Sequence, residues 1–313
     1  MSVRQKAFPV AELLLLLTAL IWGGGFIFTN LAILAGLPLS LILTLRFAIP
    51  AVMMAVFFRQ EMAIATRRDF ACGAGAGVIL FVAFFLQTYG IKYTTPANSA
   101  FLTATNVIMV PFISWLFFRQ RPAISAFPLA FTCFIGAVVL AWTPGMGMNF
   151  NVGDLLTLFC AFMFACHIAF LGAVSGITSS AAVLSVMQLG VSAVLSFLAF
   201  CIIDRASCSW EALREGMLPM LYLSLLSTGL CYFLQNWAQR RVAPAKTAIL
   251  LSCEGLFGSL LSVLCGYDTP TVTFVVGGAI ILLSVVLAQV DWSFLRTKRE
   301  PEAVPSPGTN RSL

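Results

Sequence analysis

Long runs of apolar residues separated by short polar connections dominate the chain. A membrane-spanning helix needs about 20 largely apolar residues. The runs predict ten such helices, at 12–34, 39–58, 70–90, 96–118, 124–142, 152–174, 180–203, 216–238, 243–266 and 271–290. The longest polar connection is 204–215, residues 1–11 precede the first run, and the proline-containing tail 291–313 is expected to be disordered.

Composition supports the same interpretation. Hydrophobic residues make up 60% of the 313 residues and charged residues 10%, whereas an ordinary soluble domain is about 45–50% apolar and about 25% charged. The composition excludes a soluble enzyme and a disordered chain. The predicted fold class is an all-α membrane protein with ten transmembrane helices and almost no extramembrane domain.

The distribution of basic residues predicts the orientation in the membrane. The net charge is +6, but the basic residues are scattered singly between apolar runs and form no patch for nucleic acid. With ten helices threaded from a cytoplasmic N-terminus, the outer side receives Lys92, Arg205 and Arg214, and nearly all other Lys and Arg residues fall inside. Cytoplasmic loops carry the excess of Lys and Arg, so both termini are expected in the cytoplasm.

An internal repeat divides the chain into two halves. Residues 87–102 match residues 235–250 without gaps at a spacing of 148, with Gln87 aligned to Gln235 and Pro96 to Pro244. Each half, 12–142 and 152–290, holds five predicted helices, so the second half enters the membrane with the opposite orientation. Inverted repeats of this kind are typical of secondary transporters, which bind substrate near the bilayer midplane between the halves.

The repeat also resembles a known family. The run 87–102, the segment Gly153-Asp154-Leu155-Leu156 and the stretch 235–254 resemble the EamA-type group of the drug/metabolite transporter superfamily, as two EamA-like units. This resemblance implies a ten-helix carrier of the inner or plasma membrane, often an exporter of amino acids or other small metabolites.

Two charged residues fall in the middle of predicted helices, where charge is costly and marks a functional site by default. Glu254 could bind a proton whose release is coupled to substrate movement, pair with a substrate ammonium, or be a structural carboxyl group. Arg46 could hold a substrate carboxylate by its planar fork, be the counter-ion of Glu254, or bond backbone carbonyls at a helix contact.

Further candidates lie at a similar depth. Asn106 occupies the repeat position of Glu254, and Gln188 stands roughly where Arg46 stands in the other half. Trp22 and the adjacent glycines around Gly24 could let a substrate approach the first helix, and plain packing is the alternative. The sole histidine, His167, is either a proton-linked group or a packed, hydrogen-bonded residue. It lacks the companions for a metal site, so no metal or other cofactor is expected.

The repeated Gln and Pro residues form another group. Gln87, Pro96, Gln235 and Pro244 are interpreted as gate or hinge positions, with repeat-preserved packing as the alternative. Gly73 and Gly77 form a close-packing face, for an intramolecular contact rather than a dimer. A further set of aromatic side chains could line an apolar cavity: Trp22, Phe26, Phe85, Tyr89 and Trp237.

A secondary carrier is the leading function. No phosphate-binding loop is visible, so ATP is not the direct energy source. The expected partners are a small-molecule solute, the bilayer and protons, in a monomer or weak homodimer. The alternatives are an exporter of drugs or lipophilic solutes, a channel or receptor, and a lipid-modifying membrane enzyme, which would need paired acids or a nucleophile with its base.

Overall fold

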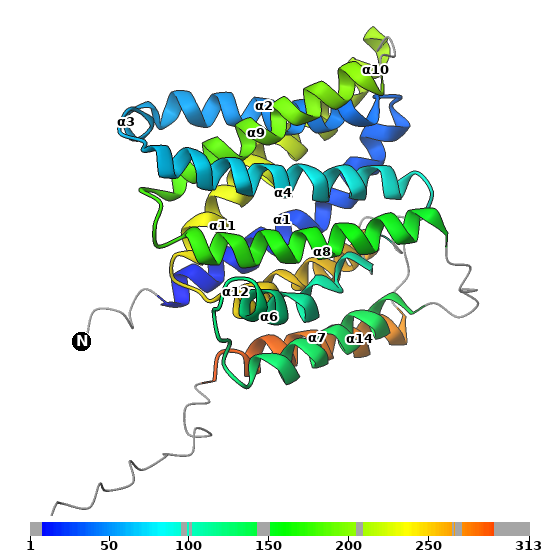
Figure 1. Cartoon of the computed structure of the whole chain (residues 1–313). Coiled ribbons are helices and arrows are strands. Elements are labelled where there is room, and N and C mark those ends of the chain that lie inside the picture. The colour runs from blue at the N-terminus through cyan, green and yellow to red at the C-terminus, as the bar shows by residue number, and fades with distance from the viewer. Residues whose placement is uncertain are drawn as a thin grey trace, which may run out of the picture.

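The chain folds entirely into helices in the part that the computed structural model describes, residues 8–94, 99, 102–142, 151–204, 209–264, 266 and 271–290 (Figure 1). The first half contains α1 (Phe8–Leu34), α2 (Leu39–Phe57), the short α3 (Arg59–Ala63), α4 (Arg67–Ile91), α6 (Asn106–Leu116) and α7 (Ala126–Ala141). The second half contains α8 (Val152–Val174), α9 (Ala181–Ile202), α10 (Trp210–Leu221), η1 (Tyr222–Leu230), α11 (Cys231–Gln239), α12 (Pro244–Leu251), α13 (Cys253–Leu264) and α14 (Val272–Leu287).

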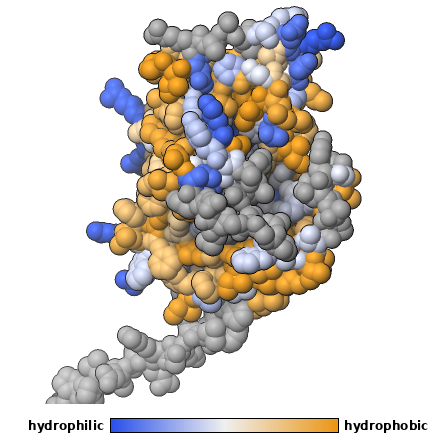
Figure 2. Space-filling model, turned by 90° about the vertical axis from the view of Figure 1, so that its right-hand side faces the viewer, coloured by the Kyte–Doolittle hydropathy of each residue, from blue (hydrophilic) through white to orange (hydrophobic). Residues whose placement is uncertain are grey.

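Among the described residues, six helices are long and apolar enough to cross a membrane, the segment Trp210–Gln239 being counted as one, and three shorter apolar helices accompany them. Hydrophobic residues prevail along the left and lower outline of the molecule in the end-on view (Figure 2), as expected of a surface that faces lipid. The start of α1 and the end of α14 lie on the same side (Figure 1). We call this the termini side.

Capping residues explain where several helices begin. The hydroxyl of Thr66 and the carboxylate of Asp69 form a reciprocal capping box that starts α4 three residues earlier than expected, at Arg67. Ser209 caps α10 by accepting a hydrogen bond from the backbone of Ala212. The expectation of a polar loop over 204–215 is therefore wrong for its second part. Similarly, α1 starts at Phe8, inside the segment expected to precede the first helix.

Two helices predicted as continuous are broken near their middle. The predicted helix 243–266 is split between α12 and α13 at Ser252, and the predicted helix 96–118 has a turn at 104–105 before α6 begins at Asn106. At each break a hydroxyl group bonds the carbonyl three residues back, Thr105 to Leu102 and Ser252 to Ile249. These bonds satisfy backbone groups that a break within a bilayer would otherwise leave exposed.

The eighth predicted helix contains a π-helical segment. Between α10 and α11 the chain winds as η1, without interruption of the span Trp210–Gln239. Wide turns of this kind are frequent at functional sites in helices. Here the widened turn carries Ser227 and Thr228, whose side chains face α2.

The two halves pack against each other in matched pairs. α2 lies on α9, and α7 lies on α14. α4 lies against α8 and α9, while its counterpart α10–η1–α11 lies against α1 and α2. Thus each contact between a helix of the first half and a helix of the second half recurs between the counterparts of those two helices. This is the packing expected of a twofold relation between the repeats.

Polar contacts at the helix ends show that the halves are inverted. Thr94, just after α4, donates to Asp154 at the start of α8 (2.6 Å), and the backbone of Ser179, after α8, donates to Asp69 at the start of α4 (2.7 Å). α4 and α8 are therefore antiparallel. Because α1 and α4 cross in the same direction, α8 runs opposite to its counterpart α1.

Glycines bring α4 close to α9. A Cβ on Gly77 would lie 2.6 Å from the carbonyl oxygen of Gln188, and one on Gly73 would overlap the side chain of Met187. The predicted glycine face therefore serves an intramolecular contact, at which the Ser192 hydroxyl also donates to the carbonyl of Gly77 (2.9 Å).

Candidate functional site

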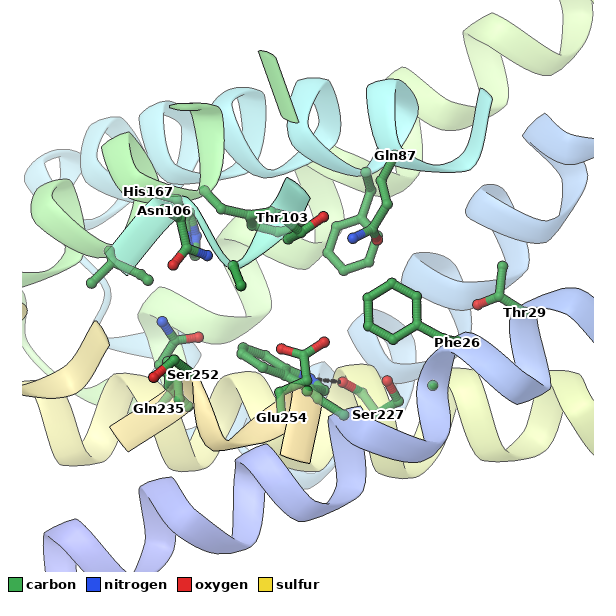
Figure 3. Close-up of a pocket in the computed structure, with 18 of the residues that line it drawn as sticks. Phe26, Thr29, Gln87, Thr103, Asn106, His167, Ser227, Gln235, Ser252 and Glu254 are labelled. Carbon is green, nitrogen blue, oxygen red and sulfur yellow. Dashed lines mark hydrogen bonds between the residues drawn. The ribbon is translucent and has the colours of Figure 1, made fainter. Parts of the chain in front are cut away.

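A cavity lies between the two halves, lined by residues of α1, α2, α4, α8, η1, α11 and both broken helices (Figure 3). The empty space, including its open mouth, is about 870 Å³. Repeat counterparts at the spacing of 148 face each other across it: Phe84 and Tyr232, Gln87 and Gln235, Asn106 and Glu254. The cavity therefore lies on the approximate twofold axis that relates the two halves.

Glu254 is the acidic residue of the cavity wall. It is the second residue of α13, directly after the break at Ser252. The positive end of a helix dipole favours a carboxylate at this place. Its carboxyl group projects into the open space (Figure 3) and forms no hydrogen bond or ion pair within the described part of the chain. It is therefore available to a ligand or a proton.

Arg46 is the cationic residue of the wall and is nearly buried, with 5% of its surface exposed. Its Nε donates to the Thr228 hydroxyl (2.8 Å) and its Nη2 to the Ser227 hydroxyl (3.0 Å). Its guanidinium lies 4.2 Å from the ring centroid of Phe84. Arg46 thus ties α2 to η1 and forms no direct ion pair with Glu254 within the described residues. The cavity holds two opposite charges that do not touch.

Aromatic side chains form much of the remaining wall. Trp22 donates from Nε1 to the carbonyl of Ser227 (2.7 Å), and its ring lies 5.4 Å from that of Tyr232 between centroids. Phe26 and Phe164 complete this surface. Fixed rings of this kind can hold the apolar body of a solute or the face of a cation.

The sequence-based expectations for the aromatic residues are partly wrong. Trp22 and Phe26 line the cavity, but Phe85, Tyr89 and Trp237 do not. Phe85 stacks on Tyr89, whose hydroxyl donates to Asp204. The ring of Trp237 lies under the guanidinium of Arg241. These three side chains pack near helix ends instead.

Of the other candidates, Asn106 and His167 line the cavity, while Gln188 and Gly24 lie behind its wall. Gln188 is fully buried and its Oε1 lies 3.1 Å from Nε2 of His167, so it supports that ring. A Cβ on Gly24 would lie 2.5 Å from the Tyr222 hydroxyl, which shows that this glycine serves helix packing. The glycine that reaches the cavity is its neighbour Gly25.

The residues predicted as gate or hinge positions do not all lie at the cavity. Gln87 and Gln235 line the cavity (Figure 3). Pro244 is the first residue of α12, where its missing N–H costs nothing, and it packs against Gly172 of α8. Pro96 lies outside the described residues.

Several lining residues escaped the sequence analysis, among them Thr103, Ser227, Tyr232 and Ser252. Extending the repeat three residues back from Gln87 would have found Tyr232 as the counterpart of Phe84. No signal in the sequence singles out Ser227, because its place depends on the π-helical turn.

Two inverted helical repeats around a central polar and aromatic cavity define a membrane transporter. The chain belongs to the EamA-like transporter family, which matches residues 9–142 and again residues 151–289. The predicted resemblance is thus confirmed, and the protein is a multi-pass membrane transporter rather than an enzyme.

Similar proteins agree with this assignment. An uncharacterized transporter of Archaeoglobus fulgidus is 31% identical over 285 residues, covering 90% of this chain and 86% of the relative. A second uncharacterized transporter of that organism is 25% identical over 285 residues, covering 88% and 96%. A solved crystal structure has a TM-score of 0.73 at 18% identity, over 90% of this chain and 96% of that chain, and shows the fold alone.

Proposed function

We propose that the protein exports small zwitterionic organic solutes, amino acids or related metabolites, from the cell by alternating access. The observation that carries this proposal is the pair of opposite charges in the central cavity. Within the described part of the chain, Glu254 offers a carboxylate without a hydrogen-bond or ion-pair partner, and Arg46 still has an Nη1 without a hydrogen-bond partner. An ammonium and a carboxylate on one solute match these two groups.

The aromatic wall and the carboxamides support the same class of solute. Trp22, Phe26 and Tyr232 provide apolar contact area, while Gln87 and Asn106 provide donors and acceptors from the opposite wall. Binding sites for small molecules commonly combine an apolar lining with a few placed polar groups.

Glu254 is also our proposed coupling residue. A carboxylate that binds either a proton or the solute ammonium, but not both, links the two movements in opposite directions. An inward proton gradient then drives solute outward, which makes the carrier an exporter. ATP is not needed for such a cycle.

We further propose that the carrier acts as a monomer in the cell (inner) membrane with its termini side in the cytoplasm. One chain supplies both walls of the cavity, so no second copy is needed. Arg59, Arg67 and Arg68 cluster where α2 meets α4, and Arg240 and Arg241 follow α11. Such clusters face the cytoplasm in membrane proteins. A weak homodimer is the alternative, and the mass of the purified carrier in detergent distinguishes the two.

A lipophilic-cation exporter is the second candidate. It is favoured by the fact that Arg46 already donates to two hydroxyl groups and stacks on Phe84, which leaves Glu254 as the freer charge. A solute with an ammonium and no carboxylate would then suffice.

The test uses proteoliposomes loaded with a mixture of amino acids and lipophilic amines. Loss of each compound is followed by mass spectrometry, with and without a pH gradient. Gradient-driven loss of amino acids supports the proposal, and loss of amines alone supports the second candidate. If no compound leaves faster than from protein-free liposomes, both proposals are wrong.

A further inference from the structure

Most residues that line the cavity have repeat counterparts that line it too. The lining residues without such a counterpart show on which side the cavity is open and on which side it is closed. When the two family matches are aligned from their first residues, 9 and 151, positions of α1 and α8 pair at a spacing of 142. Trp22 corresponds to Phe164, Gly25 to His167 and Phe26 to Ile168, and all six line the cavity. At the spacing of 148, most lining residues of α4 and of the broken helices also have counterparts that line the cavity: Phe84 and Tyr232, Gln87 and Gln235, Thr103 and Leu251, Ala104 and Ser252, Asn106 and Glu254.

Among the lining residues whose counterparts do not line the cavity, Thr29 and Ile91 lie near the ends of α1 and α4. Thr29 corresponds to Leu171, which is 1% exposed, and Ile91 corresponds to Gln239, which is 3% exposed. Thr29 lies near the end of α1, and Ile91 is the last residue of α4. Both ends face away from the termini side. The cavity therefore extends toward the side opposite the termini, and the equivalent extension toward the termini side is closed.

Specific contacts close the termini side. Gln239 donates from Nε2 to the carbonyl of Ile168 on α8 (2.9 Å). Pro244 of α12 packs so tightly on Gly172 of α8 that an added Cβ would overlap its ring. Next to this seam, Lys246 and Glu12 form an ion pair between α12 and α1 (2.6 Å).

A polar group where the cavity meets the closed region lacks a partner. Gln235 is 1% exposed and donates from Nε2 to Oε1 of Gln239 (3.0 Å), yet its own Oε1 has no hydrogen-bond partner among the described residues. A buried polar atom without a partner costs free energy. Water or solute would satisfy it once this region opens, as Gln87 is reached from the cavity on the other side.

We propose that Leu171 and Gln239 line an inner vestibule, closed in this structure, through which a polar solute reaches the cavity from the termini side. It opens by separation of α8 from α11 and α12. The Gly172–Pro244 contact and the Gln239–Ile168 hydrogen bond form its gate. The inference rests on the proposed alternating access. It adds the route by which the solute passes between the termini side and the cavity.

The test measures the accessibility of single introduced cysteines in the full chain. Gln239→Cys and Ile91→Cys are each placed in membrane vesicles and exposed to a membrane-impermeant maleimide from one side at a time. Labelling is counted above that of the parent chain, which contains its own cysteines. We expect Gln239→Cys to react from the termini side and Ile91→Cys from the opposite side.

A second substitution shifts the gate. Gly172→Ala places a methyl group against Pro244 and should raise Gln239→Cys labelling several-fold while lowering Ile91→Cys labelling. Gly190→Ala is the matched control, because a Cβ there has no atom within 4 Å. Lys246→Met, which removes the ion pair with Glu12, tests the same gate if the Gly172→Ala chain does not fold.

Two outcomes would overturn the vestibule. One is labelling of Gln239→Cys from the side opposite the termini, and the other is equal labelling in the Gly172→Ala, Lys246→Met and Gly190→Ala backgrounds. Labelling requires no solute. If labelling follows the expected pattern but no solute is transported, the proposed solutes are wrong and the proposed vestibule still stands.

Discussion

The packing of α4 on α9 allows a quantitative prediction for Gly77→Ala. The new methyl carbon would lie 2.6 Å from the carbonyl oxygen of Gln188 and 2.8 Å from Cβ of Val191. Both neighbours are backbone or directly attached to it, so the helices must move apart. Overpacking of this kind costs about 1–3 kcal/mol, while alanine gains about 0.8–1.0 kcal/mol over glycine as a helix former.

The matched control for this prediction is Gly190→Ala on α9. No atom lies within 4 Å of a Cβ at Gly190, so this variant keeps the gain in helix propensity without the clash. Because that gain cancels between the two variants, Gly77→Ala should be less stable than Gly190→Ala by about 1–3 kcal/mol. Denaturant unfolding in detergent, followed by tryptophan fluorescence, measures the difference. Equal stability of the two variants would refute the close approach of α4 and α9.

Two further predictions concern charged groups. Arg46→Gln removes two charge-assisted hydrogen bonds between α2 and η1 and should cost about 3 kcal/mol of unfolding free energy; a loss below about 0.5 kcal/mol in denaturant unfolding would contradict this. Although burial raises the pKa of Asp204, hydrogen bonds from Ser40 and Tyr89 hold that pKa below its ordinary value. Its stabilising effect is therefore present above the unfolded pKa of about 3.9 and lost as pH falls through the folded value. The melting temperature should fall more steeply below about pH 4 for the parent chain than for Asp204→Asn, and parallel melting curves would exclude the effect.

The helical membrane fold could be predicted from the sequence because its cause is local. Each apolar run must form a helix to satisfy its backbone in a bilayer, and the helix predicted over 152–174 has these same limits in the structure as α8. The repeat around Gln87 and Gln235 divides the chain into two halves of five predicted helices each. Because an odd number of membrane crossings reverses the direction of the next half, the sequence also predicted that the two halves are inverted.

The site could be predicted less completely, because its geometry depends on contacts between distant segments. Glu254 and Asn106 were found as costly polar groups at matching repeat positions. The breaks that place them at helix starts were not found, because Ser252 and Thr105 are tolerated within continuous helices as well. For Arg46 the sequence left three alternatives open, namely a solute carboxylate, Glu254 or backbone carbonyls at a helix contact. Its partners in the structure are the hydroxyl groups of Ser227 and Thr228 on η1, whose π-helical winding has no simple sequence signal.

The central claim is that a solute and a proton compete for Glu254 in the cavity between the repeats. The most direct measurement compares export from proteoliposomes by the parent chain, Glu254→Gln and the exposed control Glu211→Gln over a range of pH gradients. We expect concentrative export and its dependence on the gradient to vanish in Glu254→Gln, with thermal stability retained, and to persist in Glu211→Gln. Gradient-driven export by a folded Glu254→Gln variant would contradict the claim.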